Sequence, residues 1–308
     1  MLYKRQKLLI SMVDALGGQV GATDFQKLLF LYSKEFESPG TYDFVPYKRG
    51  CFSFTSYADK RKLIDKGFLL DDDKTWKLTK EGEQVACQNR GPRIVLESFR
   101  RRYGSKRGNT LIGEIYRRYP YFAVKSEIVD DVLEDEADRA RVEEARPAVQ
   151  GPGLLTIGYE GKSLESYLNL LLQAGVTVLC DVRRNALSRK YGFSKKTLGN
   201  ACRNLGIRYN HLPELGIASA RRQQLNTQAD YDRLFDAYEE DTLQHQTGAT
   251  EKIRQWITKE NERVALTCYE LHPHQCHRQR VAWAVEKKLG RKHNTEHLLG
   301  GAWRASGS

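Results

Sequence analysis

The residues L-L-T-I-G-Y at 154–159 begin a repeating pattern from which the fold class of the C-terminal half follows. They form an apolar run of strand length, and three more such runs follow at 176–180, 207–212 and 263–269. Segments with the apolar spacing of amphipathic helices lie between these runs. Strands that alternate with helices predict a parallel sheet with right-handed crossovers. We therefore expect an α/β domain over residues 151–308.

Residues 1–91 show a different pattern, in which helical segments precede two short strands. The strands, at 68–70 and 75–79, flank an acidic turn, which is typical of the wing of a winged helix. The string F-V-P-Y-K-R-G-C-F-S at 44–53 resembles the winged-helix module of the SocA-type antitoxin group, over about residues 1–85. That resemblance implies a module that contacts protein or DNA and carries no catalytic residues.

A basic helical connector is expected over residues 92–150. Nine basic and two acidic residues lie between Arg90 and Arg118, so this segment contributes +7 to a net charge of +11. Arginines match phosphate oxygens and the interleaved aromatic rings can stack on bases, so we expect a nucleic-acid surface. The alternative is a plain solvated pair of helices. The predicted DNA-binding residues are Arg100, Arg101, Arg102, Lys106, Arg107, Arg117 and Arg118.

The composition is that of a globular protein with about two domains. The chain has 308 residues, 40% hydrophobic and 29% charged, and domains usually hold roughly 100–200 residues. A linker rich in proline and glycine at 147–153 marks the clearest boundary. We find no apolar run of the roughly 18–20 residues that a membrane helix needs, and no signal-peptide pattern. Six cysteines occur singly, so we expect reduced thiols in a cytoplasmic protein.

Polar side chains follow each predicted strand at its carboxyl end. In chain order they are Tyr159 and Glu160, Asp181 and Arg183, His211, and the run E-L-H-P-H-Q-C-H-R at 270–278. All seven histidines lie at or beyond His211, so histidine chemistry belongs to the C-terminal half. Because ligands bind outside the carboxyl ends of the strands in an open parallel sheet, we expect a functional site there.

Four ordered motifs in this region carry a family resemblance. They are T-I-G-Y-E-G at 156–161, D-V-R at 181–183, G-I-x-Y-x-H-L-P-E-L-G at 206–216 and E-x-x-P-x-x-C-H-R at 270–278. Over about residues 154–290 the chain resembles domain-of-unknown-function family 488. Ala186 stands where the family's loop has proline. The resemblance implies a Rossmann-like sheet and implies no particular reaction.

Each strand-end residue has a functional interpretation and a structural one. The candidate catalytic carboxylates are Asp181, Glu270 and Glu160. Asp181 either stabilises a cationic transition state or pairs with Arg183 to hold the loop. Tyr159 either stacks on a base or packs within the rim. The candidate substrate-binding residues are Tyr159, Arg183, His211, Cys276, His277 and Arg278.

Cys276 has three interpretations: a nucleophile, a metal ligand, or part of an anion site at a helix start. The arginine of a thiol-phosphatase loop is missing, because position 282 is alanine. Zinc ligation by Cys268, His272 and Cys276 lacks the spacing of a zinc ribbon, so no metal is expected. We therefore favour the anion site. Neither a phosphate-binding loop nor a dinucleotide fingerprint is present, so no nucleotide cofactor is expected.

The pattern favours a DNA-processing enzyme, with a DNA glycosylase as the most specific hypothesis. Hydrolysis of the N-glycosidic bond of a modified or damaged base needs an extruded base, a carboxylate and arginines on the flanking phosphates of double-stranded DNA. Such an enzyme would serve DNA repair or antiviral defence. One alternative is a non-catalytic winged-helix DNA-binding regulator that senses a ligand. A third possibility is a nuclease.

Overall fold

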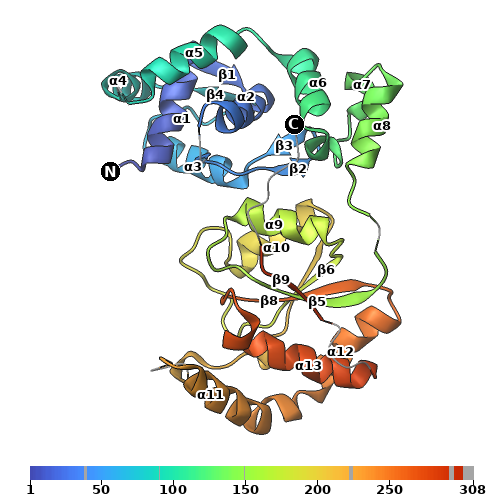
Figure 1. The fold of residues 1–308 in the computed structure, drawn as a ribbon. Coiled ribbons are helices and arrows are strands. Elements are labelled where there is room, and N and C mark those ends of the chain that lie inside the picture. Colours follow the sequence, from blue (N-terminus) through green and yellow to red (C-terminus); the bar gives the residue numbers. More distant parts are fainter. Residues whose placement is uncertain (38–39, 90, 149, 222–224, 291–294, 301–308) are drawn as a thin grey trace. The chain divides into compact units, whose positions relative to one another are not determined.

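The computed structural model describes residues 1–37, 40–89, 91–148, 150–221, 225–290 and 295–300 (Figure 1). The chain divides into two compact units, of which the first ends at Arg146 and the second begins at Pro147. The division falls at the start of the predicted linker, 147–153, of which residue 149 lies outside the described residues.

The N-terminal unit combines helices with two small antiparallel sheets, in which β1 pairs with β4 and β2 pairs with β3. The strands are β1 (Gln19–Gly21), β2 (Val45–Tyr47), β3 (Gly50–Phe52) and β4 (Thr75–Lys77). The helices are α1 (Lys4–Ala15), α2 (Ala22–Glu35), α3 (Phe54–Asp65), α4 (Lys80–Gln88), α5 (Arg93–Tyr103), α6 (Gly108–Arg118), the 3-10 turn η1 (Pro120–Ala123), α7 (Val129–Val132) and α8 (Glu136–Glu144).

The strands expected at 68–70 and 75–79 meet at a bridge between Leu69 and Leu78. Strand β4 also pairs with β1, so the hairpin has a third member. Helix α5 contacts α1 and α6 contacts α2, so the helices of the expected basic connector pack within this unit. The winged-helix assignment stays a prediction.

The described strands of the C-terminal unit form a five-stranded sheet in the order β7-β6-β8-β5-β9, with every pair parallel. The strands are β5 (Gly153–Gly158), β6 (Val178–Asp181), β7 (Arg208–His211), β8 (Arg263–Cys268) and β9 (Glu296–Leu298). The predicted α/β fold with a Rossmann-like parallel sheet is confirmed. Strand β9 is an addition to the four strands expected from the sequence.

Helices cover both faces of this sheet. Figure 1 shows α9 and α10 over one face and α12 and α13 over the other. Strand and helix residues share a buried core that includes Val178, Val264, Leu266, Ile253, Trp256, Val281 and Val285. The helices are α9 (Leu164–Gln173), α10 (Lys195–Asn204), α11 (Gln228–Asp241), α12 (Thr247–Thr258) and α13 (His277–Leu289), and the 3-10 turns are η2 (Pro213–Leu215), η3 (Ser219–Arg221), η4 (Leu243–His245) and η5 (Pro273–Gln275).

Serine caps begin some of these helices where the sequence places them. Ser163 accepts a hydrogen bond from the amide of Ser166 at 3.0 Å and so starts α9.

Among the described residues, no helix has both the length and the apolar character needed to cross a membrane.

Candidate functional site

Strands β6, β8 and β5 are neighbours, and their carboxyl ends bring the predicted residues to one edge of the sheet. Gly158, the last residue of β5, allows the loop after β8 to approach closely. A Cβ atom at this position would lie 1.8 Å from the carbonyl oxygen of Glu270, so a side chain is excluded. The loops are also joined directly, because the amide of Glu160 donates to the carbonyl of Tyr269 at 2.9 Å.

Asp181, at the end of β6, is fully buried and engaged on both carboxylate oxygens. Arg183 donates from Nε to Oδ1 at 2.8 Å and from Nη2 to Oδ2 at 2.6 Å. Tyr209 adds its hydroxyl to Oδ2 at 2.6 Å. Burial lowers the pKa of Arg183, but the hydrogen bonds and charge of Asp181 outweigh burial and raise that pKa above its ordinary value. This geometry matches the interpretation in which Asp181 and Arg183 form a loop-holding ion pair.

Tyr159 and His211 pack around the same arginine. The Tyr159 ring stacks on Phe193 with 4.4 Å between centroids, and its hydroxyl accepts from Nη1 of Arg183 at 3.0 Å. Nε2 of His211 donates to the carbonyl of Arg183 at 2.8 Å. Because Tyr159 is only 4% exposed, its ring is part of the packed rim and presents no open face to a base.

The other two candidate carboxylates are half-buried. Glu160 accepts the amide of Leu271 on Oε2 at 2.9 Å, which fixes the loop after β8. Glu270 accepts from the thiol of Cys268 at 3.2 Å and also lines a cavity of about 430 Å³. The cavity is further lined by Leu225, Asn226, Tyr231, Leu234, Phe235 and Gln275.

Two buried cations at this edge lack an acidic partner within the described part of the chain. Arg278, on α13, is 0% exposed and donates to the carbonyl oxygens of Glu270 at 2.5 Å and Leu271 at 2.8 Å. Lys162, in the loop after β5, is 8% exposed. Neither Nε of Arg278 nor Nζ of Lys162 has a hydrogen-bond partner among the residues that the structure describes. Among the described residues, no carboxylate forms an ion pair with either side chain. Buried charges are normally paired, so this arrangement is unusual.

The surroundings of Lys162 disfavour its charge. Burial lowers its pKa to about 8, the positive charges of Arg278 and Lys190 contribute to this, and Glu160 acts weakly in the opposite direction. Lys190 donates to the carbonyl of Tyr159 at 3.2 Å. The lysines and Arg278 therefore surround the end of β5 with positive charge. The position of Lys162 in a loop gives no sequence signal of a buried cation, since a lysine in a loop normally extends into solvent.

The last two residues of the C-H-R motif begin a helix beside a second thiol. Cys276 and His277 lie at the start of α13, and Cys268 ends β8; all three side chains are buried. Burial raises the pKa of Cys276 well above its ordinary value, and Cys268 contributes further, which argues against a thiolate nucleophile. The imidazole beside the two thiols is that of His277, whereas His272, the one considered from spacing, stacks on His274. Among the histidines, His293 lies outside the described residues.

Comparison with known families bears on this unit. Residues 163–285 match the model of the family described as domain of unknown function DUF488. This segment is a DUF488 domain. No curated protein and no solved structure matches the chain. The DUF488 domain includes Asp181, Arg183, His211 and the C-H-R motif, whereas Lys162 lies just before its first residue.

Outside the DUF488 domain, the predicted DNA-binding residues lie on α5, α6 and the turn between them. Arg100, Arg101 and Arg102 are exposed on α5. Lys106 and Arg118 form ion pairs with Glu114. Further pairs join Arg118 and Arg102 to Glu35 and Arg117 to Asp138, and Arg107 donates to the carbonyl of Lys106. Arg90, the first residue of the basic run, lies outside the described residues.

The aromatic residues interleaved with these arginines are mostly internal. Phe99, Tyr103, Tyr116 and Phe122 are buried in the core of the N-terminal unit. They are therefore not available to stack on bases, and the exposed arginines remain as the groups suited to phosphate contact.

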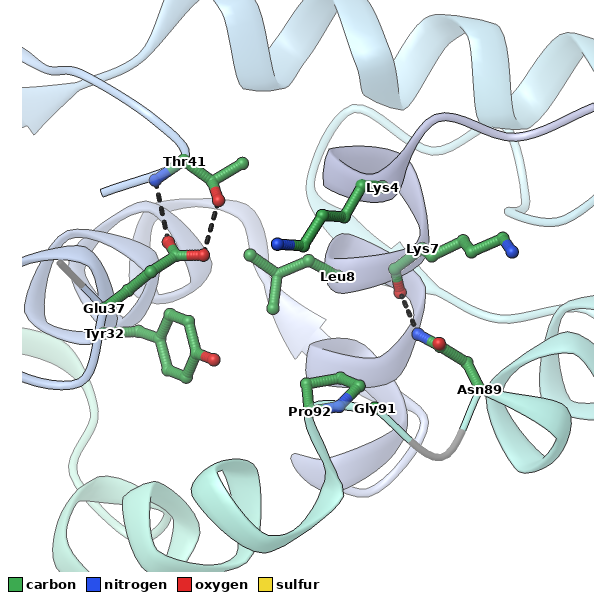
Figure 2. A pocket seen from close by; sticks show the side chains of 9 residues that line it. All are labelled: Lys4, Lys7, Leu8, Tyr32, Glu37, Thr41, Asn89, Gly91 and Pro92. Atoms are coloured by element: carbon green, nitrogen blue, oxygen red, sulfur yellow. Dashed lines mark hydrogen bonds between the residues drawn. The ribbon is translucent and has the colours of Figure 1, made fainter. Parts of the chain in front are cut away.

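The N-terminal unit also contains a cavity of about 330 Å³, shown in Figure 2. Glu37 on its wall accepts hydrogen bonds from the amide and hydroxyl of Thr41, and Asn89 donates to the carbonyl of Lys7 (Figure 2). None of the residues predicted to be functional lines this cavity.

Proposed function

We propose that this protein processes DNA, and that the edge of the parallel sheet in its C-terminal unit binds an anionic group of the substrate through Lys162 and Arg278. The observation that carries the proposal is the burial of both cations without a carboxylate partner among the described residues. A phosphate group would supply the missing negative charge and accept hydrogen bonds from Lys162 Nζ and Arg278 Nε. Arginine and lysine are the side chains that most often serve this purpose.

The cavity beside Glu270 supports hydrolysis of an N-glycosidic bond as the reaction. Its volume of about 430 Å³ is within the range of small-molecule sites. Tyr231 and Phe235 supply aromatic surface, and Asn226 and Gln275 supply amides that can bond the edge of a base. Glu270 adds a carboxylate to the wall, where it can stabilise positive charge that develops on the sugar.

We assign the reacting carboxylate to Glu270 in preference to Asp181. Asp181 is bonded on both oxygens and its charge is neutralised by Arg183. Glu270 is half-buried and faces the cavity. In this proposal Asp181 and Arg183 hold the rim, and Glu270 acts on the substrate.

The N-terminal unit would contact the DNA backbone through Arg100, Arg101 and Arg102. These three arginines are exposed, and arginine neutralises phosphates without reading base sequence.

We place the protein in the cytoplasm, because none of its six cysteines, all within the described residues, forms a disulfide. Repair of damaged bases and defence against phage DNA are the two roles that fit this activity.

A strand-cleavage assay tests the proposal. Duplexes that carry single modified bases are incubated with the full chain, and alkali then converts abasic sites into breaks. We expect breaks that depend on alkali, and a rate about 100–1000-fold lower for Glu270→Gln, because one electrostatic contact in the transition state is lost. Lys162→Met should weaken substrate binding, and Lys196→Met, an exposed lysine on α10, is the matched control.

Three results would contradict the proposal. Breaks before alkali treatment would indicate a nuclease. Binding to DNA with no product from any modified duplex would favour the regulator. Full activity in Glu270→Gln would remove that carboxylate from the reaction.

A further inference from the structure

We infer that Cys268, Cys276 and His277 form a binding site for a divalent metal ion that prefers sulfur ligands, with Zn²⁺ as the expected ion. Cys268 ends β8, and Cys276 and His277 begin α13. One potential ligand atom from each side chain, the two Sγ atoms and a ring nitrogen, lies within 4.8 Å of the others. The site is independent of the proposed function, since none of these side chains is used in it.

The spacing of the ligand atoms is close to that of a tetrahedral zinc site. Nδ1 of His277 lies 3.8 Å from Sγ of Cys268 and 3.9 Å from Sγ of Cys276. With Zn–S near 2.3 Å and Zn–N near 2.05 Å, tetrahedral geometry places sulfur and nitrogen about 3.6 Å apart. Both observed distances between sulfur and nitrogen therefore differ from the tetrahedral value by only a few tenths of an ångström.

The ring of His277 is also oriented as a metal ligand. Its Nε2 lies 2.9 Å from the carbonyl oxygen of Val182. A carbonyl can only accept, so Nε2 carries the proton, and in the neutral ring Nδ1 then has a free electron pair. That electron pair faces the two sulfur atoms. Metal-bound histidines commonly donate their other ring N–H to a carbonyl in this way, which fixes the tautomer.

The donor set selects the class of ion. Two sulfurs and one imidazole suit Zn²⁺, whereas Mg²⁺ and Ca²⁺ prefer oxygen ligands. Two thiolates would balance the charge of a divalent ion, so the buried site would be neutral. A water molecule would complete four ligands.

A metal at this position would fasten three parts of the domain. Cys268 belongs to the end of β8, His277 to the start of α13, and Val182, which His277 contacts, to the loop after β6. Arg278 follows His277 directly, so the metal would also fix the helix turn that carries this cation.

The test is a metal titration of the full chain. The purified protein is treated with a chelator and a reductant, and Co²⁺ is then added as a spectroscopic probe, followed by Zn²⁺. We expect one Co²⁺ per chain, with thiolate-to-cobalt charge-transfer absorption and the visible bands of a tetrahedral ion, both lost when Zn²⁺ is added. Zn²⁺ should also raise the unfolding temperature, because it binds the folded state.

Two cysteine variants provide the comparison. Cys276→Ala should lose the charge-transfer band that depends on its sulfur and bind Co²⁺ at least tenfold more weakly. Cys202→Ala removes another buried thiol, on α10, and should bind Co²⁺ as the wild type does. The wild-type titration needs no variant, so a variant that fails to fold leaves the result intact. Absence of Co²⁺ binding by the wild-type chain, a spectrum without thiolate ligands, or equal losses in both variants would overturn the inference.

Discussion

The charge on Lys162 should make anion binding at the domain edge depend on pH. Burial and the neighbouring cations lower the pKa of this lysine to about 8. As the pH rises through 8, the ammonium loses its proton and can no longer attract an anion. Burial also lowers the pKa of neighbouring Lys190, so the Lys162→Met variant is needed to assign the pH dependence to Lys162.

The size of the effect follows from the pKa. With a pKa of about 8, roughly 90% of the Lys162 side chains are protonated at pH 7 and roughly 10% at pH 9. If an anion binds only to the protonated form, the dissociation constant should rise about tenfold between these two pH values.

In the absence of an anion, the lowered pKa of Lys162 should make the folded protein more stable as the pH rises. The unfolded chain holds this proton more tightly, so the free energy of unfolding should rise as the pH increases from about 8 toward the ordinary value of 10.5.

Calorimetric titration with sulfate at pH 7, 8 and 9 and constant ionic strength measures this directly. Sulfate suits the purpose because its own charge does not change over this range. At pH 7, Lys162→Met should weaken binding by about 10–150-fold, since hydrogen bonds to charged groups contribute roughly 1.5–3 kcal/mol. The variant should also show no pH dependence, while Lys196→Met should behave as the wild type. Equal sulfate affinity of the wild type at pH 7 and pH 9 would show that Lys162 does not bind the anion, as would a pH dependence that persists in Lys162→Met.

Three further predictions concern the rim and the basic helices. Replacing Arg100–Arg102 by alanine should weaken DNA binding about equally for all sequences. It should also reduce the dependence of the binding constant on salt concentration by up to about three phosphate contacts. An unchanged salt dependence in an anisotropy titration would show that these arginines are solvated and do not contact DNA. Asp181→Asn should lower the free energy of unfolding in urea by about 3–5 kcal/mol, because it leaves the buried charge of Arg183 uncompensated; a loss below about 1 kcal/mol would argue against the ion pair. Gly158→Ala should lower the free energy of unfolding by at least about 1–3 kcal/mol, because the new Cβ would overlap a backbone carbonyl. Gly151→Ala, where a Cβ meets no described atom within 4 Å, should lower it little. Equal losses of stability in the two variants would contradict the close approach of the loop to Gly158.

The fold of the C-terminal unit was predictable because its signals are local. Four apolar runs bounded by polar loops predict β5, β6, β7 and β8, and the structure places them within a residue or two of the expected limits. Strand β9 was missed because it has three residues, Glu296–Leu298, and no apolar run. It pairs with β5 at the edge of the sheet, which no local pattern reveals.

The position of the site in the fold was predictable from the sequence, whereas the contacts between its residues were less so. The residues that follow the strands indicated the edge of the sheet where the candidate residues gather, since the loops after parallel strands all lie at the carboxyl ends of those strands. Lys162 was missed because Arg278 and Lys190, the cations that act on it, are distant from it in sequence. His272 rather than His277 was considered beside the two cysteines. Spacing along the chain does not show which imidazole faces the sulfur atoms, whereas the structure places Nδ1 of His277 within 3.9 Å of both.

A crystal structure of the full chain bound to a short 5′-phosphorylated oligonucleotide would show whether the two buried cations bind phosphate. We expect a phosphate group within hydrogen-bond distance of Lys162 Nζ and Arg278 Nε, with a base in the cavity beside Glu270. A phosphate bound elsewhere, with both cations still lacking an anionic partner, would contradict this expectation.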